Sequence, residues 1–330
     1  MKSIIGVGNA LTDILAVLPD DELIRRFHLP VGSMQHVDEE TGEEIWNVLR
    51  EKGVQFVSGG SAANTIGGTS VFGMKSAFIG KVGDDELGSL FRTSQENLGI
   101  ESILFKGTLA TGRAMVFVRS DTGERTFATY LGSAIQLEPD ELKGEFFIGY
   151  DYCYIEGYLV QNQDLLRKAT ELAKMAGCTV VLDLASYNVV ESNNAFLHDI
   201  IENYVDILFA NEKEAEYFTG KSTEEALEDM ASICDIAVVK MGERGSIIRR
   251  GNKVYKIKAC PAHAIDATGA GDIYASGFIY AHSLGMPLDI CGRVGSIISG
   301  KVVEVVGPKV DIPRWKTAKA EIRNLMGLAV

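Results

Sequence analysis

The feature that most constrains the fold of this chain is a repeated alternation of short apolar runs with longer stretches of helical character. From Tyr152 onward, three apolar runs are each followed by such a stretch. The pairs are Tyr152–Ile155 with Gln163–Ala176, Thr179–Leu184 with Asn194–Asn203, and Asp206–Ala210 with Glu212–Thr219. Repeated strand–helix units predict a doubly wound, mostly parallel α/β sheet with helices on both faces. Ligands of such folds bind beyond the carboxyl ends of the strands, which directs attention to the loops after the apolar runs.

The other predicted elements extend this pattern over the whole chain. Strands are predicted at Ser3–Val7, Phe56–Val57, Ala77–Val82 and Ile236–Lys240, and a hairpin at Ser246–Arg250 with Val254–Lys258. Helices are predicted at Ser61–Phe72, Asp84–Leu98, Gly271–Ser283, Pro287–Val305 and Pro313–Met326, and the polar stretches Asp20–His36 and Asp38–Glu51 are also helix-prone. No Pro- or Ser-rich linker interrupts these elements, so one domain is predicted.

One segment departs from the alternation and predicts a small β insertion. The β-rich runs Arg113–Arg119 and Glu124–Tyr130 are joined by Ser120–Gly123, whose sequence is a good hairpin turn. From Ile103 to Leu131 no helical stretch intervenes. We therefore expect a small antiparallel insertion that acts as a lid.

Charge and composition exclude several classes of function. The chain has 32 Lys and Arg against 45 Asp and Glu, a net charge of −13, which argues against a general nucleic-acid binder because such proteins depend on basic contacts to phosphate. No run approaches the ~18 apolar residues of a membrane span, and the N-terminus lacks the apolar core of a signal peptide. The five cysteines are scattered without a C-x-x-C pair, as expected for reduced thiols. We expect a cytoplasmic protein without nucleic-acid or membrane partners.

The strongest local motif is Asp266–Asp272, with the sequence Asp-Ala-Thr-Gly-Ala-Gly-Asp, between the predicted hairpin and an apolar helix. Consecutive small residues at a helix N-terminus leave backbone N–H groups uncovered, and these groups bind a phosphate or a developing oxyanion. The carboxylate of Asp272 would repel a bound anion, but it makes sense as a general base that takes a proton from a hydroxyl attacking a phosphoryl group. The alternative is that Asp272 is only a favourable first-turn acid and that the glycines serve turn geometry.

Two further motifs follow predicted strands near the N-terminus. Gly59-Gly60-Ser61-Ala62-Ala63-Asn64 offers close backbone approach and one side-chain amide, or alternatively serves only tight helix–sheet packing with Asn64 as a satisfied polar residue. Gly8-Asn9 precedes Asp13, whose carboxylate could accept two hydrogen bonds from a vicinal diol. A Gly-x-Gly spacing here also suggests a dinucleotide fingerprint, but Leu11 occupies the third glycine position and the match fails.

The fourth motif is Asn211-Glu212-Lys213-Glu214, directly after a buried-looking apolar run. Asn211 and Glu214 are three residues apart on a predicted first helical turn, so their side chains face the same way and could hold a magnesium-bound water. The alternative is a plain helix start with acidic first-turn residues. The five histidines show no metal-ligand spacing, so a metal held by histidine is not expected.

Taken together and in order, these motifs resemble the ribokinase-like (PfkB-type) family of sugar and nucleoside kinases, and the likeness covers nearly the whole chain. The matching segments are Gly8-Asn9 with Asp13, Gly59-Gly60 with Asn64, Gly80–Gly88, Asn211 with Glu214, Lys240–Gly245, and Asp266–Asp272. The resemblance implies a ribokinase-like, doubly wound α/β fold with a small β-sheet lid. Residues 1–330 would then form a single kinase domain, with lid segments at approximately 12–40 and 106–132.

The resemblance also implies roles for individual residues. Asp272 would be the catalytic base, and the anion hole would consist of the backbone amides of Gly269, Ala270 and Gly271. Substrate binding would fall to Asn9, Asp13, Gly59, Gly60, Asn64 and, from the lid, Arg113. The residues that would bind ATP and organise Mg²⁺ are Asn211, Glu214, Lys240, Gly242, Gly245 and Thr268, with Glu214 holding Mg²⁺ through water.

Within the family, two segments are most similar to the adenosine-kinase branch. These are Gly8–Ile14 with the long stretch that follows to Gln35, and the helix that ends in Gly295–Gly300 before Gly307. Ala62-Ala63-Asn64 instead follows the general sugar-kinase pattern, and Ala267 stands where Thr is commoner. The implied substrate is therefore a nucleoside or a sugar.

The implied activity is ATP- and Mg²⁺-dependent phosphorylation of a primary hydroxyl of an adenosine-like nucleoside or a furanose sugar, with potassium as a further ion in many members. One alternative is a sugar kinase of the ribokinase, fructokinase or 2-keto-3-deoxygluconate kinase type. The other is a non-catalytic, ligand-binding regulator on the same fold. An open edge of the lid sheet would allow either a monomer or a homodimer through the lid.

Overall fold

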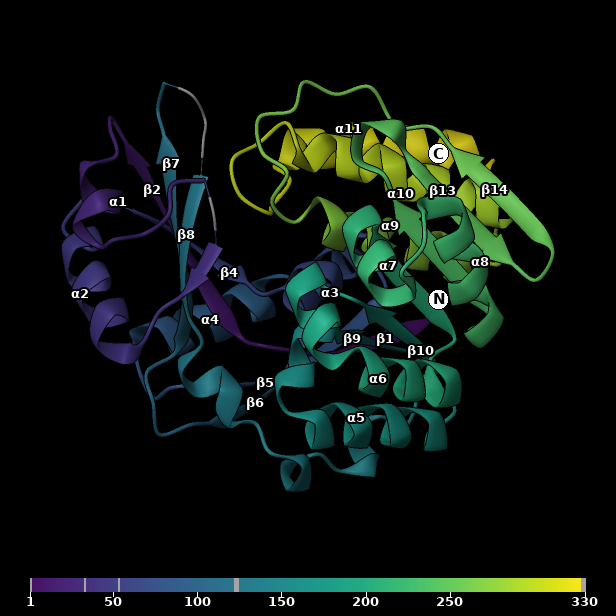
Figure 1. Cartoon of the computed structure of the whole chain (residues 1–330), viewed down its shortest axis with the longest axis horizontal. Helices are drawn as coiled ribbons and strands as arrows, with labels where there is room; N and C mark the ends of the chain where they lie inside the picture. The colour runs from purple at the N-terminus through teal and green to yellow at the C-terminus, as the bar shows by residue number, and fades with distance from the viewer. Residues whose placement is uncertain (1, 33, 53, 122–124, 328–330) are drawn as a thin grey trace.

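The computed structural model describes residues 2–32, 34–52, 54–121 and 125–327, and the chain folds around two β-sheets of different size (Figure 1). The larger sheet has nine strands and the smaller has five. In Figure 1 the smaller sheet stands to the left of the larger one, so the described part of the chain has two unequal lobes.

The larger sheet is mostly parallel, as the strand–helix alternation predicts. Its strands lie in the order β14 (Lys253–Ile257), β13 (Ser246–Arg250), β12 (Ile236–Lys240), β11 (Ile207–Asn211), β10 (Thr179–Asp183), β9 (Tyr152–Glu156), β1 (Ser3–Val7), β5 (Lys75–Val82) and β6 (Glu101–Lys106). Pairing is parallel from β12 to β6, and β13 and β14 add an antiparallel edge. The carboxyl ends of β9 to β12 therefore meet at one side of the sheet.

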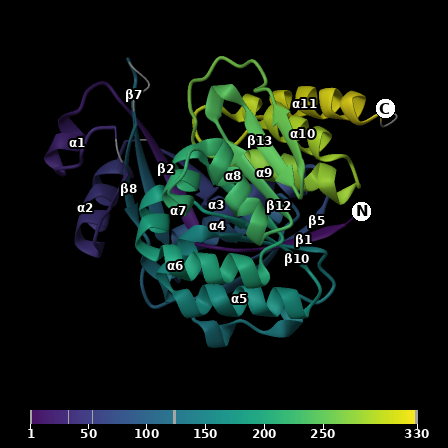
Figure 2. The ribbon, with the colours of Figure 1, turned by 45° about the vertical axis from the view of Figure 1, so that its right-hand side comes forward.

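Helices cover both faces of the larger sheet, because alternate residues of a strand point to opposite faces. One layer consists of α3 (Ser61–Val71), α4 (Glu86–Asn97), α9 (Ala270–Ser283), α10 (Leu288–Val302) and α11 (Ile312–Met326). The other consists of α5 (Gln163–Met175), α6 (Tyr187–Tyr204), α7 (Glu212–Thr219) and α8 (Thr223–Ile233). Ile4 of β1 packs into the first layer, and its neighbour Ile5 packs into the second. Figure 2 shows α10 and α11 above the strands and α5 and α6 below them.

Short 3₁₀ helices complete the described secondary structure at Gly132–Gln136, Pro139–Glu141, Gly144–Phe146, Gly157–Gln161 and Gly242–Arg244. None of the helices within the described ranges combines the length and the apolar character that crossing a membrane requires.

The smaller sheet joins segments that lie far apart in the sequence. Its strands lie in the order β3 (Met34–His36), β8 (Arg125–Tyr130), β7 (Gly112–Arg119), β2 (Leu11–Leu18) and β4 (Gln55–Gly59). Helices α1 (Glu22–Arg26) and α2 (Glu39–Leu49) cover one face, where Ile14, Ile45 and Phe117 are buried. The other face carries Leu15 and Phe127 and turns toward the larger sheet.

The smaller sheet is not the purely antiparallel insertion that the sequence predicts. β7 and β8 do pair antiparallel, but β2 pairs parallel with β7 and β3 pairs parallel with β8, so the sheet is mixed. The expected turn at Ser120–Gly123 lies partly outside the described residues. β4 belongs to this sheet although it falls outside both expected lid segments, because it pairs antiparallel with β2.

The composition of the polar stretch Asp20–His36 suggests a helix, but the stretch does not form a single helix. The α-helix covers Glu22–Arg26, and Met34–His36 forms a strand. Pro30 lies between them and has no backbone N–H to continue a helix, and Gly32 has a φ of 75°. Strand β2 and helix α8 were not predicted at all, and β6 belongs to the larger sheet rather than to an insertion.

Candidate active site

A cavity of about 950 Å³ lies between the carboxyl ends of β9 to β12 and the inner face of the smaller sheet. The larger sheet contributes Asp183 and Lys240 to its wall, the smaller sheet contributes Asp13 and Phe127, and α9 contributes Asp272. Small-molecule sites usually measure about 300–1,000 Å³. The cavity is therefore at the upper end of that range.

Four neighbouring strands each end in a polar residue that lines this cavity. Glu156 ends β9, Asp183 ends β10, Asn211 ends β11 and Lys240 ends β12. The register of the sheet places Glu156 beside Asp183, and Asn211 beside Lys240. Parallel strands gather such residues because their carboxyl ends meet at one side of the sheet.

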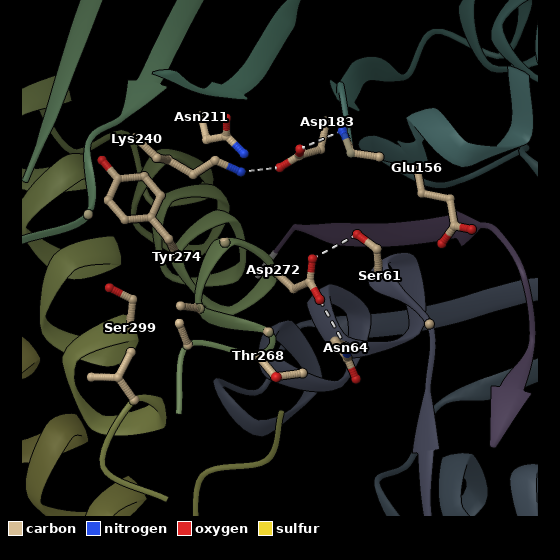
Figure 3. A pocket seen from close by; sticks show the side chains of 18 of the residues that line it. Ser61, Asn64, Glu156, Asp183, Asn211, Lys240, Thr268, Asp272, Tyr274 and Ser299 are labelled. Atoms are coloured by element: carbon tan, nitrogen blue, oxygen red, sulfur yellow. Dashed lines mark hydrogen bonds and ion pairs between the residues drawn. The ribbon is translucent and has the colours of Figure 1, made fainter. Parts of the chain in front are cut away.

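Asp272 lies in the first turn of α9 between two hydrogen-bond donors from α3 (Figure 3). Ser61 Oγ donates to Oδ1 at 2.7 Å, and Asn64 Nδ2 donates to Oδ2 at 3.0 Å. Burial raises the pKa of Asp272 to about 6, and the two hydrogen bonds act against this increase. The carboxylate is therefore ionised at neutral pH and faces the cavity, as a general base must.

The loop before α9 is held in shape by the buried carboxylate of Asp266. It accepts hydrogen bonds from the backbone N–H of Thr268 at 2.6 Å and of Gly307 at 2.5 Å. It also pairs with Arg125 of β8, and Arg125 Nη1 donates to the Thr268 hydroxyl at 2.8 Å. The smaller sheet is thereby joined to the loop that carries the expected anion hole.

The expected anion hole has a glycine where only glycine fits. Gly269 has a φ of 72°, and a Cβ there would lie 2.6 Å from Pro308 Cβ. The amide of Ala270 donates to the carbonyl of Ala267 at 3.1 Å. Of the three amides expected to bind an anion, those of Gly269 and Gly271 are therefore the better placed.

Glu156 organises the side of the cavity that lies nearer the smaller sheet. Its Oε1 accepts hydrogen bonds from the backbone N and from Nδ2 of Asn9, at 2.8 and 2.7 Å, and its Oε2 accepts one from the backbone N of Ala62 at 2.8 Å. Glu156 thus ties the loop after β1 to the first turn of α3. Burial raises the pKa of this carboxyl to about 7.

Asp13 is buried in the cavity wall on β2. A Cβ on Gly59 would lie 2.0 Å from Asp13 Oδ1, so the carboxylate occupies the space that a side chain on Gly59 would fill. Burial raises the pKa of Asp13 to about 7, while the charge of Lys309 lowers it and that of Asp272 raises it. Asn64 Oδ1 is also buried and has no hydrogen-bond partner among the described residues. Such an acceptor costs about 1–3 kcal/mol if nothing satisfies it, which points to a ligand hydroxyl.

The opposite side of the cavity combines a cation with two buried carboxylates. Lys240 Nζ donates to Asp183 Oδ2 at 2.5 Å (Figure 3) and lies 3.0 Å from the position that a Cβ on Gly271 would take. Asn211 and Glu214 cap the start of α7 reciprocally: Asn211 Nδ2 donates to Glu214 Oε1 at 2.5 Å, and the backbone N of Glu214 donates to Asn211 Oδ1 at 3.0 Å. The plain helix start considered for this motif is therefore present, and both residues also line the cavity.

These residues fit a magnesium ion that arrives with a nucleotide rather than one held by the protein alone. Burial and the neighbouring Asp183 raise the pKa of Glu214 to about 7, so added positive charge would be favourable there. Within the described ranges no three His, Cys, Asp or Glu residues are grouped to hold a metal. Mg²⁺ is commonly bound by one or two carboxylates together with waters and substrate phosphates.

Most of the residues singled out from the sequence do meet at this cavity. They are Asn9, Asp13, Gly60, Asn64, Asn211, Glu214, Lys240, Gly242, Gly245, Thr268, Gly269, Ala270, Gly271 and Asp272. Gly59 lies directly behind the Asp13 carboxylate.

Arg113, for which the resemblance implies a substrate contact, does not line the cavity. Its guanidinium pairs with Glu43 of α2 and lies 5.3 Å from the centre of the Tyr130 ring. The reason is the alternation of side chains along β7, which turns Ala114 toward the cavity and Arg113 toward the helices.

Five residues in or beside the site were not identified from the sequence. Some of them have a local sequence pattern that could have indicated their role, and others have none. Glu156 and Asp183 are carboxylates at the ends of strands with apolar interiors, a pattern that marks the ligand side of a parallel sheet. Ser61 lies inside a recognised motif. Arg125 contacts the site through Thr268, and Lys309 lies behind it against Ser58. Both positions depend on tertiary packing, and nothing in the local sequence indicates them.

Comparisons with known proteins agree with this geometry. The sequence pattern of the pfkB family of carbohydrate kinases matches residues 31–315. The chain is similar to the structure of a probable sugar kinase from Rhizobium etli CFN 42, with a TM-score of 0.88 and 31% identity over 97% of this chain and 99% of that one. It is also similar to adenosine kinase from Sinorhizobium meliloti, with a TM-score of 0.87 and 30% identity over 97% and 99% of the two chains. A nucleoside kinase from Methanothermobacter thermautotrophicus is 27% identical, over 89% of this chain and 93% of that protein.

Proposed function

This chain belongs to the pfkB family of carbohydrate kinases, and we propose that it transfers the γ-phosphoryl group of ATP to a primary hydroxyl of an adenosine-like nucleoside. The observation that carries this proposal is the setting of Asp272. The carboxylate lies at the N-terminus of α9, hydrogen-bonded on both oxygens, inside a cavity that has the buried carboxylate of Asp13 on one side and a lysine with two buried carboxylates on the other.

In the proposed reaction, Asp272 acts as the general base. The oxygen of the acceptor hydroxyl forms a bond to the γ-phosphorus as the bond between that phosphorus and the β-phosphate oxygen breaks. The hydroxyl proton passes to the Asp272 carboxylate, and ADP leaves. A general base of this kind contributes about 10²- to 10⁴-fold to the rate.

Stabilisation of the transferred group is assigned to the loop before α9 and to Lys240. The amides of Gly269 and Gly271 lie at the positive end of the α9 dipole, where negative charge is favoured. Lys240 Nζ lies beside Gly271 and adds a full positive charge. Bound Mg²⁺ would neutralise charge on the phosphate oxygens, and Glu214 and Asp183 are the residues that would hold its waters.

Binding of the acceptor is assigned to Asp13 and Asn64, whose oxygens can accept hydrogen bonds from the two hydroxyls of a ribose. Charge-assisted hydrogen bonds to a carboxylate are about twice as strong as neutral ones. The cavity wall formed by the smaller sheet is mostly apolar, with Leu11, Met34, Ala114, Phe127 and Leu131, and His36 and Thr129 add polar groups to it. A wall of this kind suits the flat face of a nucleobase, whereas a free sugar would leave hydroxyls against it unpaired.

Phosphorylation of a furanose or related sugar is the second candidate. Its support is the 31% identity to a probable sugar kinase over nearly the whole of both chains. The same base and anion hole would serve either acceptor, because both present a primary hydroxyl.

The test is a coupled assay of ADP release from Mg-ATP, with adenosine, inosine, cytidine, ribose, fructose and 2-keto-3-deoxygluconate as acceptors, each with and without potassium. We expect turnover that is selective for a nucleoside. Selectivity for a sugar would overturn the acceptor assignment and leave the mechanism in place. No turnover with any acceptor, while ATP still binds, would contradict the proposal as a whole.

A further inference from the structure

One line of side chains crosses the inner face of the smaller sheet, from Asp13 on β2 to the edge strand β3. In the register of the sheet, Asp13 lies beside Ala114 of β7, and Ala114 lies beside Thr129 of β8. Thr129 in turn lies beside His36 of β3. Register partners on neighbouring strands point to the same face of a sheet, and all four residues line the cavity. We call these four residues the cross-strand row.

The cross-strand row carries the polar side chains of this wall, and the rows beside it are apolar. The residues of the neighbouring rows that line the cavity are Phe127 and Met34 on one side and Leu11 and Leu131 on the other. Among the described residues, the hydroxyl of Thr129 and the ring of His36 have no hydrogen-bond partner. Two polar groups that the proposed reaction does not use are therefore free to bind a ligand.

The shape of the cross-strand row indicates what kind of ligand it would take. Neighbouring strands are ~4.8 Å apart, so the backbones of Asp13 and His36, three strands apart, are separated by about 14 Å. A furanose ring held at Asp13 is too short to reach His36, whereas a base attached to that ring extends along the row. A nucleobase has apolar faces and carries its polar atoms at the edge, which suits a polar line between apolar rows.

We propose that Thr129 and His36 are specificity-determining residues that hydrogen-bond the polar edge of a purine base, while Asp13 holds the ribose diol. This inference rests on the proposed function for its nucleoside acceptor. The small side chain of Ala114 leaves room for the ring between the two ends of the row. A hydroxyl and a neutral imidazole can each donate and accept, and the edge of adenine presents an amino donor beside a ring-nitrogen acceptor. A purine is favoured over a pyrimidine because its six-membered ring lies farther from the ribose.

The test is calorimetric binding, without ATP, of adenosine and of benzimidazole riboside. The second nucleoside has nearly the same shape but lacks the amino group and the ring nitrogens of the adenine six-membered ring. We expect His36→Leu and Thr129→Val each to bind adenosine about three- to tenfold more weakly than the wild type, because one hydrogen bond is lost. Benzimidazole riboside should bind to both variants within about twofold of its affinity for the wild type, since it has no polar edge to lose.

Gln35→Leu is the matched control. Gln35 lies between Met34 and His36 on β3, so its side chain points to the opposite face of the sheet, and it is not among the described residues that line the cavity. The affinities for both nucleosides should stay unchanged in this variant. Thr129→Ser and His36→Gln each keep a donor and an acceptor, so they should restore much of the affinity for adenosine, and they replace the apolar variants as a test if either of those does not fold.

The role of the cross-strand row and the proposed acceptor fail in different ways. If the wild type binds neither nucleoside and phosphorylates a sugar, the acceptor is wrong and the role of the row falls with it. If the wild type binds adenosine, and His36→Leu and Thr129→Val either bind it equally well or lose affinity for both nucleosides by the same factor, the two side chains do not read the base edge. The role of the row is then overturned and the acceptor stands.

Discussion

Asp272 accepts hydrogen bonds from two donors that each stabilise its ionised form, and the balance between these bonds and burial sets the pH at which it could act as the proposed base. Burial raises its pKa to about 6, and the hydrogen bonds from Asn64 and Ser61 keep the pKa from rising further. A base must be deprotonated to accept a proton, so activity should rise with pH as the carboxyl ionises and level off above that point.

Replacing Ser61 by alanine removes one of these donors and should shift the acid limb of the pH–rate profile upward. A hydrogen bond to a charged group is worth about 1.5–3 kcal/mol, so a shift of about one pH unit is expected. The loss in kcat/KM should then be several-fold greater at pH 6 than at pH 8. Ser70→Ala is the matched control, because Ser70 lies on the same helix and donates to the carbonyl of Leu98. Equal losses for Ser61→Ala at both pH values would contradict this role.

At the residue scale, the sequence indicated the groups that belong to local motifs and missed those that act across the fold. Asp272, Asn64 and Asp13 follow glycine-containing turns after predicted strands, and such turns mark the ligand side of a sheet. Lys309 has no such context, because its position depends on how the segment after α10 docks on the smaller sheet. The position of Arg113 away from the cavity could not be predicted for a related reason, since the face to which a strand residue points depends on register.

At the scale of single elements, the contact between β2 and β4 decides where the Asp13 carboxylate lies. Gly59→Ala would place a methyl group within 2.0 Å of Asp13 Oδ1, so the carboxylate must move. We expect KM for the acceptor to rise by at least about tenfold, as the loss of a charge-assisted hydrogen bond implies. The control is Gly67→Ala in α3, where the new methyl group would meet Leu98 Cδ1 at an ordinary 3.6 Å. An unchanged KM in Gly59→Ala would contradict the placement of Asp13.

The strands and helices of the larger sheet could be predicted because each central strand is an apolar run that is followed in the sequence by a helix. Tyr152–Ile155 and Asp206–Ala210, for example, correspond to β9 and β11 within one or two residues. The smaller sheet could not be derived in the same way. β2 follows β1 after a short gap without a helix, and β3 has only three residues, so neither shows a period that distinguishes it.

At the scale of the whole molecule, several buried carboxyl side chains line the same cavity. Burial raises the pKa values of Asp13, Glu156 and Glu214 to about 7 and that of Asp272 to about 6. The folded chain therefore binds more protons than the unfolded chain between about pH 4 and pH 7. The contribution of these groups to stability is fully present at pH values below their ordinary pKa values, and it is lost as the pH rises through their folded-state pKa values of about 6 to 7. His282, whose pKa burial lowers, acts in the opposite direction below its ordinary value.

The protein without ligands should accordingly be more stable at pH 5.5 than at pH 8. Each proton bound only by the folded state changes the free energy of unfolding by about 1.4 kcal/mol per pH unit, so a difference of a few kcal/mol is expected. Urea denaturation at the two pH values measures it. The decrease in the free energy of unfolding with rising pH should be smaller in Asp13→Asn. A wild type that is more stable at pH 8 than at pH 5.5 would mean that these carboxylates are ionised and compensated in the folded state.

In the proposed reaction each lobe supplies one side of the site, and Asp272 lies between them. Single-turnover transfer from Mg-ATP to adenosine by Asp272→Asn, with the binding of both ligands measured separately, examines that arrangement directly. We predict a rate lower by about 10²- to 10⁴-fold, with both ligands bound nearly as in the wild type and the fold intact. A rate close to that of the wild type would show that Asp272 is not the base.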